Sequence, residues 1–254
     1  MADLQYLLRE SKTRFLQSFA NNRINIQLEK PIISFTFDDV PRTALVNGIP
    51  ILDQYNIKAT YYVAMGLSCF QSSNNELEAY LDPDDILELH RNGHDIACHT
   101  YSHYMLKTGT AKDLAHDADK NVRKLKALLG TTSIEHFSYP FGQVNFKEKK
   151  LLANSYKTMR SSRPGINTSK TDMHLLRATS IYNPTFEKNK LIKIIEDAER
   201  QRGWLIFYTH GVNNKPDAYS CKTEQLQWVI QQCLASSFRI LPISEAYSCI
   251  IKSQ

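Results

Sequence analysis

Two adjacent carboxylates and a pair of histidines have the residue types and spacing of a metal site. Asp38 and Asp39 follow an apolar run, where two buried charges would repel each other unless a divalent cation binds one of them. His99 and His103 form an H-x-x-x-H pattern, so a helical turn would bring both imidazoles to one ion. Together with Asp39 they make a ligand set that suits catalytic zinc and also non-haem iron. The alternative is a solvated Asp pair and two unrelated histidines.

A further histidine, His210, has the chemistry of a proton donor or acceptor. It follows the most apolar segment of the chain, WLIFYT at residues 204–209. The unperturbed pKa of an imidazole, about 6.5, suits proton transfer at neutral pH. We therefore expect His210 beside the metal, with a hydrogen-bonded loop histidine as the alternative. His94 precedes a predicted strand, which favours a structural role.

Short apolar runs that alternate with amphipathic segments must position these residues. The predicted strands are 32–37, 59–63, 95–98, 136–139, 157–160, 175–179, 204–209 and 238–241. The predicted helices are 43–54, 83–92, 111–129, 188–201 and 223–236. This alternation predicts an α/β fold with a parallel sheet, and its length favours a distorted (β/α)7-8 barrel. In barrels the working residues lie at the carboxyl ends of strands, where the carboxylates and histidines fall.

Composition and charge are those of an ordinary globular protein. The 254 residues carry 31 Lys+Arg and 26 Asp+Glu, a net charge of +5, and 42% are hydrophobic, which excludes a disordered or fibrous chain. The charge is mild and forms no stripe with aromatics, so we expect no nucleic acid partner. The five cysteines are scattered and form no CxxC pair.

We expect one domain over residues 31–254, preceded by a helical lead-in over residues 1–30. No apolar stretch is long enough for a transmembrane segment, and the charged start has no signal-peptide core, which predicts a cytoplasmic location. The sequence indicates no oligomeric state.

Four short motifs resemble those of a known family. They are TFDD at 36–39, HTYSH at 99–103 after GHDI at 93–96, YPFG at 139–142 and THG at 209–211. In order and spacing they are similar to the polysaccharide deacetylase family, which is carbohydrate esterase family 4 or the NodB homology domain, over residues 32–243. The resemblance implies a distorted barrel and metal-dependent removal of N- or O-acyl groups from sugars.

The resemblance also implies a role for each residue of the site. It makes Asp38 the general base and His210 the general acid, and the backbone N–H of Tyr139 an oxyanion donor. The metal ligands would be Asp39, His99 and His103. General chemistry agrees, because a divalent ion polarises an acyl carbonyl and acidifies water, and an amine leaves only when it is protonated.

Two departures from the family pattern concern the groups around the base and the acid. Ser138 stands where the family often has an Arg that holds the base, and residues 159–167 contain no carboxylate that would tune the histidine. Arg160 or Arg163 either replaces the missing Arg or binds an anionic group of the substrate. The alternative is two solvated loop arginines.

The main hypothesis is a zinc-dependent N-deacetylase that acts on an amino sugar or glycan precursor and holds one divalent ion. A nucleotide-linked or lipid-linked sugar would fit an intracellular substrate, as would a deformylase variant of the same chemistry. The alternatives are an amidohydrolase for a small non-sugar amide or cyclic imide, and a catalytically silent carbohydrate-binding barrel. An iron(II) oxygenase is disfavoured by the additional acid–base pair.

Overall fold

The computed structural model describes residues 22–68, 79–105 and 109–254. Its strands are β1 (Arg23–Ile26), β2 (Ile32–Asp38), β3 (Thr60–Val63), β4 (Asp95–Cys98), β5 (His136–Ser138), β6 (Thr158–Arg160), β7 (Ser169–Asp172), β8 (Thr179–Ser180), β9 (Trp204–Thr209) and β10 (Arg239–Ile240). Its helices are η1 (Ala44–Gly48), α2 (Ile49–Gln54), α3 (Met65–Ser68), α4 (Pro83–Arg91), α5 (Ala111–Leu129), α6 (Phe146–Leu152), α7 (Lys188–Arg200), α8 (Thr223–Leu234) and α9 (Ile243–Lys252). The short turns are η4 (Pro140–Gly142), η5 (Met173–Leu175) and η6 (Asn183–Thr185).

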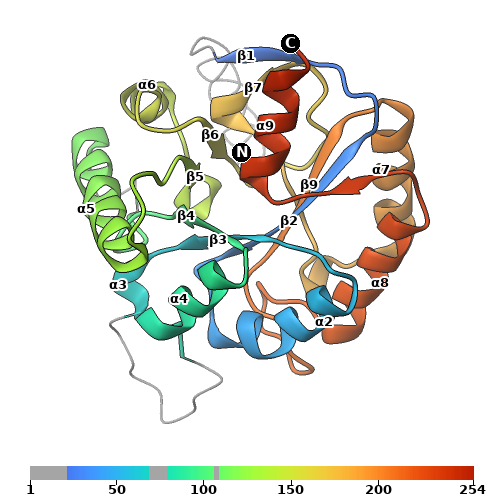
Figure 1. Ribbon diagram of the computed structural model, residues 1–254, viewed down its shortest axis with the longest axis horizontal. Helices are drawn as coiled ribbons and strands as arrows, with labels where there is room; N and C mark the ends of the chain where they lie inside the picture. Colours follow the sequence, from blue (N-terminus) through green and yellow to red (C-terminus); the bar gives the residue numbers. More distant parts are fainter. Residues whose placement is uncertain (1–21, 69–78, 106–108) are drawn as a thin grey trace, which may run out of the picture.

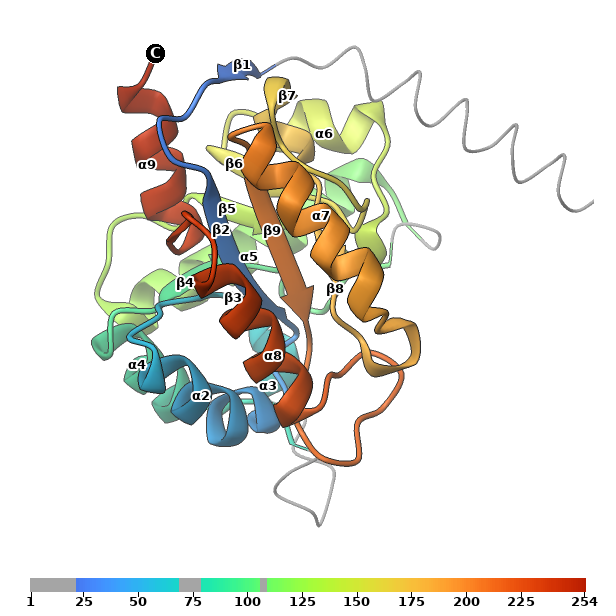
Figure 2. The same cartoon turned by 90° about the vertical axis from the view of Figure 1, so that its right-hand side faces the viewer.

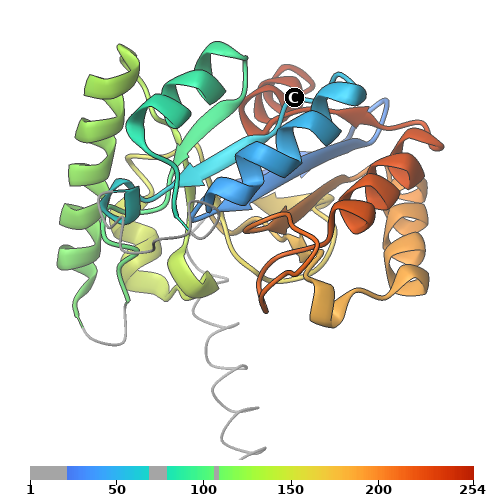
Figure 3. The same ribbon diagram turned by 90° about the horizontal axis from the view of Figure 1, so that it is seen from below.

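A curled parallel sheet forms the centre of a single α/β domain. Its strands follow the order β6-β5-β4-β3-β2-β9-β8, and β10 pairs with the start of β2. The helices form a ring around the strands (Figure 1), with α5 on one side and α7 and α8 on the other (Figure 3). This half-barrel confirms the predicted fold class.

The two ends of the curled sheet approach each other through the segment that enters β8. Leu176 donates its backbone N–H to Met159 and accepts a hydrogen bond from Ser161, on either side of the last residue of β6. Residues 179–180 then pair with β9. The predicted strand at 175–179 is therefore shifted: its first residue belongs to η5, and the regular strand is 179–180.

Side-chain alternation along the central strands separates two parts of the core. Phe37 of β2 and Phe207 of β9 belong to the cluster that packs against the helices. Ile32 and Trp204 belong to a second cluster, which α9 also joins. β2 and β9 run side by side (Figure 2), so matching residues of the two strands share a face. Asp38 has the parity of Ile32 and therefore lies on the face opposite to Phe37.

Local sequence explains where the longer helices begin and end. The Asp82 side chain accepts a hydrogen bond from the backbone N–H of Asp85, Pro83 occupies the first turn of α4, and the reciprocal bond completes a capping box. Thr110 and Asp113 cap α5 in the same way. That helix ends at Gly130, whose φ of +64° lies in the left-handed region that favours glycine.

The amino-terminal prediction is wrong where it can be compared. Residues 23–26 form β1, which pairs antiparallel with β7, and the rest of the expected helical lead-in, residues 1–21, lies outside the described residues. The sequence interpretation also missed β7, α6 and α9. No helix within the described ranges has both the length and the apolarity needed to cross a membrane.

Candidate active site

The carboxylate pair lies where β2 leaves the sheet. Asp38 is its last residue and is buried. Asp39 and Val40 then adopt positive φ angles of 58° and 57°, a conformation that costs energy for residues other than glycine. His103 and Phe141, which face the same cavity, also have positive φ, at 52° and 58°. Backbone strain is thus concentrated around the predicted site.

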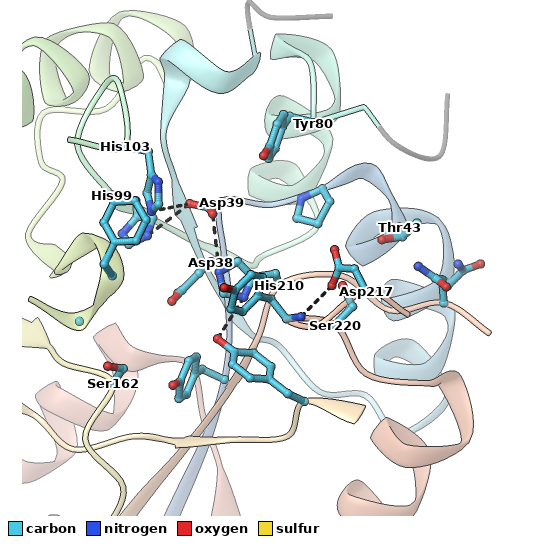
Figure 4. A pocket seen from close by; sticks show the side chains of 18 of the residues that line it. Asp38, Asp39, Thr43, Tyr80, His99, His103, Ser162, His210, Asp217 and Ser220 are labelled. Carbon is cyan, nitrogen blue, oxygen red and sulfur yellow. Dashed lines mark hydrogen bonds and ion pairs between the residues drawn. The ribbon is translucent and has the colours of Figure 1, made fainter. Parts of the chain in front are cut away.

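The predicted metal ligands are brought together. Asp39 Oδ1 lies 3.4 Å from His99 Nε2 and 3.3 Å from His103 Nε2. One ligand atom from each of the three residues lies within 4.8 Å of the others (Figure 4). Oδ1 of Asp39 is buried and has no hydrogen-bond partner among the described residues. The sequence prediction that these three side chains converge is therefore correct.

Hydrogen bonding shows why a cation fits between these atoms. His99 Nδ1 lies 2.8 Å from the carbonyl oxygen of Ser138, so Nδ1 carries the proton and donates it. Nε2 of His99 is then an unprotonated lone pair that faces the unsatisfied Asp39 oxygen. A divalent ion is a partner that both can bind, and a carbonyl behind the imidazole is the usual support for a histidine ligand.

The electrostatics of the three ligands agree with this fit. Burial lowers the pKa of His99 to about 3 and that of His103 to about 4. Both imidazoles are therefore neutral near pH 7, and each has a lone pair that can bind a metal ion. Burial, reinforced by the charge of Asp38, raises the pKa of Asp39 to about 8 in the metal-free protein. A bound cation would remove this conflict by stabilising the ionised carboxylate.

The loop that carries the two histidines is held from behind by α5. The carboxylate of Asp117 accepts hydrogen bonds from the backbone N–H groups of Tyr101, at 2.8 Å, and Ser102, at 2.9 Å. Gly66 donates its N–H to the Tyr101 carbonyl at 2.7 Å, and a Cβ at residue 66 would lie only 2.4 Å from that oxygen. The sequence interpretation did not identify either support.

Asp38 is paired with Arg160 at the end of β6. Nη2 of Arg160 contacts both carboxylate oxygens of Asp38 and also the hydroxyl of Ser138. Burial alone would raise the pKa of Asp38, but the charge of Arg160 and its hydrogen bond to the carboxylate hold that pKa below its usual value. Asp38 is therefore an ionised carboxylate beside the three predicted metal ligands Asp39, His99 and His103, which together are called the ligand cluster.

Arg160 is fully enclosed and held by aromatic rings. Its guanidinium lies over the rings of Tyr62, at 5.0 Å, and Tyr208, at 4.8 Å. Ser138 and Arg160 are register partners on the neighbouring strands β5 and β6. The position where the family pattern places an arginine is thus filled by serine, and the adjacent strand supplies the guanidinium.

His210 faces the ligand cluster from the end of β9. Its Nε2 lies 3.6 Å from Asp39 Oδ2, and its Nδ1 lies 3.2 Å from the hydroxyl oxygen of Tyr182. Burial lowers its pKa below the usual imidazole value. The predicted proximity of His210 to the ligands is correct, and Tyr182 is a contact that the sequence interpretation missed.

The predicted role of the Tyr139 backbone N–H is wrong. This N–H donates to the carbonyl of Arg160 at 3.0 Å within the sheet, so it is not free to bind an oxyanion. The Tyr139 hydroxyl donates to the His174 carbonyl at 3.2 Å on the core side. Only part of Tyr139 reaches the cavity wall.

A large cavity opens over the ligand cluster. Its volume is about 1140 Å³, and its wall includes both aspartates, the three histidines and Arg160. Phe141 and Tyr219 also line it and are 48% and 61% exposed, which is unusual for large aromatic side chains. Arg163 does not line this cavity, so of the two candidate arginines only Arg160 belongs to the site.

Tyr182, Phe141 and Tyr219 were not predicted as site residues, and two of them had a detectable signal. Tyr182 follows the end of β8 by two residues, and Phe141 lies in the YPFG motif directly after β5. Reading every strand end would have found both. Tyr219 comes from the loop after β9, and its place at the cavity depends on the path of that loop.

Comparison with known proteins identifies the family. The model of the family "Polysaccharide deacetylase" matches residues 25–158, which is more than half of the chain. The chain belongs to the polysaccharide deacetylase family. The family is named for the deacetylation of polysaccharides, and its members are generally metal-dependent, which agrees with the ligand cluster.

Curated relatives match part of the chain. A chitin deacetylase of Colletotrichum lindemuthianum is 32% identical over 91 residues, which are 35% of this chain and 34% of that protein. A bifunctional xylanase/deacetylase of Pseudobutyrivibrio xylanivorans is 25% identical over 125 residues, 49% of this chain and 19% of the relative. The chain thus matches about a third or less of the length of these relatives.

Solved structures of low sequence identity share the fold. A family 4 acetyl xylan esterase from Clostridium thermocellum, solved with a cobalt ion, has a TM-score of 0.58 at 17% identity. The match covers 85% of this chain and 90% of the esterase chain. A CE4 family pseudoenzyme from Bacillus anthracis has a TM-score of 0.61 at 13% identity, with 87% and 66% covered. At these identities the likeness concerns the fold alone.

Proposed function

We propose that this polysaccharide deacetylase family member is a zinc-dependent carbohydrate N-deacetylase that removes an acyl group, acetyl in the simplest case, from an amino sugar. The observation that carries the proposal is the convergence of Asp39, His99 and His103 beside Asp38 and His210, two groups suited to proton transfer. Two imidazoles and one carboxylate form a donor set that zinc uses in catalytic sites.

A divalent ion in this cluster would supply Lewis-acid polarisation of the acyl carbonyl and would acidify a water molecule. The chain's own residues perform the proton transfers. Asp38 is ionised, lines the same cavity as the cluster and is held by Arg160, so it takes a proton from the attacking water. The same ion pair prevents the carboxylate from rotating toward the ion.

His210 completes the reaction on the leaving-group side. Its Nε2 faces Asp39 across 3.6 Å, while its Nδ1 is occupied by the Tyr182 hydroxyl. Nε2 is therefore the nitrogen that donates a proton to the departing amine. The nitrogen of an amide leaves only when it is protonated, so this donor matters more for an N-acyl than for an O-acyl substrate.

The cavity supports a sugar substrate. Phe141 and Tyr219 expose their rings beside the ligand cluster, and aromatic rings offer an apolar face on which the C–H face of a sugar can pack. Asn213 and Asn214 line the same cavity and provide amides that can bond to sugar hydroxyls. The volume of about 1140 Å³ is more than a small amide or cyclic imide needs.

The test is acetate release by the zinc-loaded chain from N-acetylated chito-oligosaccharides, nucleotide-linked N-acetyl sugars and O-acetylated xylo-oligosaccharides. We expect chelator-sensitive release from an N-acetyl substrate and loss of turnover in Asp38→Asn with unchanged zinc content. Release from a cyclic imide only would favour the amidohydrolase alternative. Sugar binding without any hydrolysis would favour a silent barrel, and full activity in Asp38→Asn would overturn the base assignment.

A further inference from the structure

We propose that Tyr182 is the positioning residue of His210 and holds Nε2 of this imidazole toward the ligand cluster. The inference depends on the proposed function in one respect, which is that His210 donates a proton to the leaving group. In this inference the neutral phenol of Tyr182, which lies just after β8, orients the imidazole of His210.

The imidazole of His210 lies between two oxygens. Its Nδ1 is 3.2 Å from Tyr182 Oη, and its Nε2 is 3.6 Å from Asp39 Oδ2. Within the part of the chain that the structure describes, no carboxylate is hydrogen-bonded to Nδ1. With Nδ1 bound to the hydroxyl, a ring flip would break this bond and turn Nε2 away from the cavity.

The hydroxyl of Tyr182 is itself held in place. The Ile181 N–H bonds to the Tyr208 carbonyl at 3.0 Å, which extends the pairing of β8 with β9 up to Tyr182. The Tyr182 ring packs edge-on against Tyr208, at 5.3 Å between ring centroids, and against Tyr219, at 5.8 Å. Two strands and a loop therefore fix the direction of its hydroxyl.

Tyr182 and His210 also share a backbone anchor. The N–H of His210 bonds to the carbonyl of Tyr219 at 3.1 Å, and the N–H of Asn183 bonds to the carbonyl of Ser220 at 2.9 Å. Two adjacent residues of one loop, Tyr219 and Ser220, thus hold the backbone at His210 and directly after Tyr182. The contact between Nδ1 and Oη is built into the fold at both ends.

A hydroxyl suits both forms of the acid. It accepts a hydrogen bond from Nδ1–H when the ring is an imidazolium, and it can rotate to donate when Nδ1 is unprotonated. In the leaving step the Nε2 proton passes to the substrate nitrogen as the C–N bond breaks and its electron pair goes to that nitrogen. The products are the amine and the carboxylic acid. Asp38 then releases to solvent the proton that it took from water, and His210 takes up a proton from solvent.

The kinetic test compares Tyr182→Phe with Tyr247→Phe in the full zinc-loaded chain. Tyr247 lies in α9 beside His136 and does not line the cavity, so it is a matched control. Because general acid catalysis is worth ~10²–10⁴-fold, we expect loss of its positioning partner to lower kcat ~10–100-fold, with KM and zinc content unchanged. The fall should be smaller on an O-acetyl ester, and Tyr247→Phe should match the wild type.

A double variant and a spectrum separate positioning from a structural effect. In a His210→Gln background, Tyr182→Phe should lower kcat no further. In ¹⁵N-histidine spectra the Nδ1 and Nε2 resonances of His210, assigned by their loss in His210→Gln, should shift in Tyr182→Phe while those of His94 stay in place. An equal kcat loss in both backgrounds, or unchanged His210 resonances, would overturn the inference. If the wild type hydrolyses O-acetyl esters alone, N-deacetylation is refuted. The role of Tyr182 is then tested by the ester hydrolysis rates of the variants and by the histidine spectrum.

Discussion

Arg160 reaches Asp38 across 122 positions of sequence and contacts both carboxylate oxygens through one nitrogen, Nη2. The pair is buried, and the same nitrogen also contacts the Ser138 hydroxyl. Arg160 keeps Asp38, the proposed base, ionised and fixes the position of its carboxylate beside the ligand cluster. The guanidinium that the family pattern places on β5 comes here from β6, at the register partner of Ser138.

Replacement of Arg160 should therefore affect both catalysis and folding. In Arg160→Met we expect kcat/KM to fall by at least ~10²-fold, because the base loses its orientation. The free energy of unfolding should fall by about 3–5 kcal/mol, because Asp38 is left as a buried unpaired charge. Deacetylation rates and urea unfolding curves measure the two effects, and Arg163→Met, outside the cavity, is the control.

Moving the arginine back tests the strand assignment directly. The double variant Ser138→Arg/Arg160→Ser places the guanidinium on β5, at the residue that pairs directly with position 160 on the neighbouring strand. We expect it to recover part of the activity that Arg160→Ser alone loses. Wild-type rates in Arg160→Met would show that Asp38 does not depend on this partner.

Asp117 should control metal affinity without touching the metal. It accepts hydrogen bonds from the backbone of Tyr101 and Ser102, between the two histidine ligands. Loss of such a support usually costs ~10–100-fold in metal affinity, so we expect this weakening of zinc binding in Asp117→Ala. Competition with a chromogenic chelator measures it. Asp119→Ala, on the same helix and in an exposed ion pair with Arg123, should keep wild-type affinity. Equal affinities in both variants would contradict the prediction.

Zinc should stabilise the folded chain through the three ligands. A ligand that binds only the native state adds about 2.7 kcal/mol at 100 times its dissociation constant, which for this chain length corresponds to a rise in Tm of roughly 5–10 °C. Differential scanning fluorimetry of the chelator-treated protein with and without zinc measures the rise. His103→Gln should abolish it, while Asp38→Asn and the surface variant His116→Gln should retain it. The same rise in His103→Gln would mean that zinc binds elsewhere.

His94 should make stability depend on pH. The backbone N–H of Ala59 donates to His94 Nδ1 at 3.1 Å, and burial lowers the pKa of His94 to about 4, against about 6.5 in an unfolded chain. Between these values the unfolded state binds more protons, so stability falls as pH drops from 6.5 toward 4 and then levels off. The loss attributable to His94 is about 3 kcal/mol.

His94→Asn keeps an acceptor for the Ala59 N–H and does not titrate in this range. We expect its unfolding free energy in urea to change less between pH 7.5 and pH 4.5 than that of the wild type. The pKa of His136 is also lowered to about 4 by burial, and it contributes equally in both proteins. Identical pH slopes would assign the effect to other groups.

The ligand cluster could be predicted from the sequence because each of its members lies in the segment that directly follows a recognisable strand. Asp39 follows an apolar strand, and His99 and His103 share one short loop at the end of another. Strand–helix alternation places both strand ends on one edge of a parallel sheet, whatever the details of packing. The fold class and the three ligands follow from this pattern. Strand ends were less certain, as the shift from 175–179 to 179–180 shows.

The tertiary structure alone decided which groups support the chemistry. Strand register placed Arg160 rather than Arg163 beside Asp38. The backbone N–H of Tyr139 donates to the carbonyl of Arg160 within the sheet and is therefore not available to a substrate. The pairing of β8 with β9 placed the Tyr182 hydroxyl on His210. Residue types and spacing encode which side chains end a strand. Register, hydrogen-bond direction and contacts between distant strands arise only when the whole sheet is assembled.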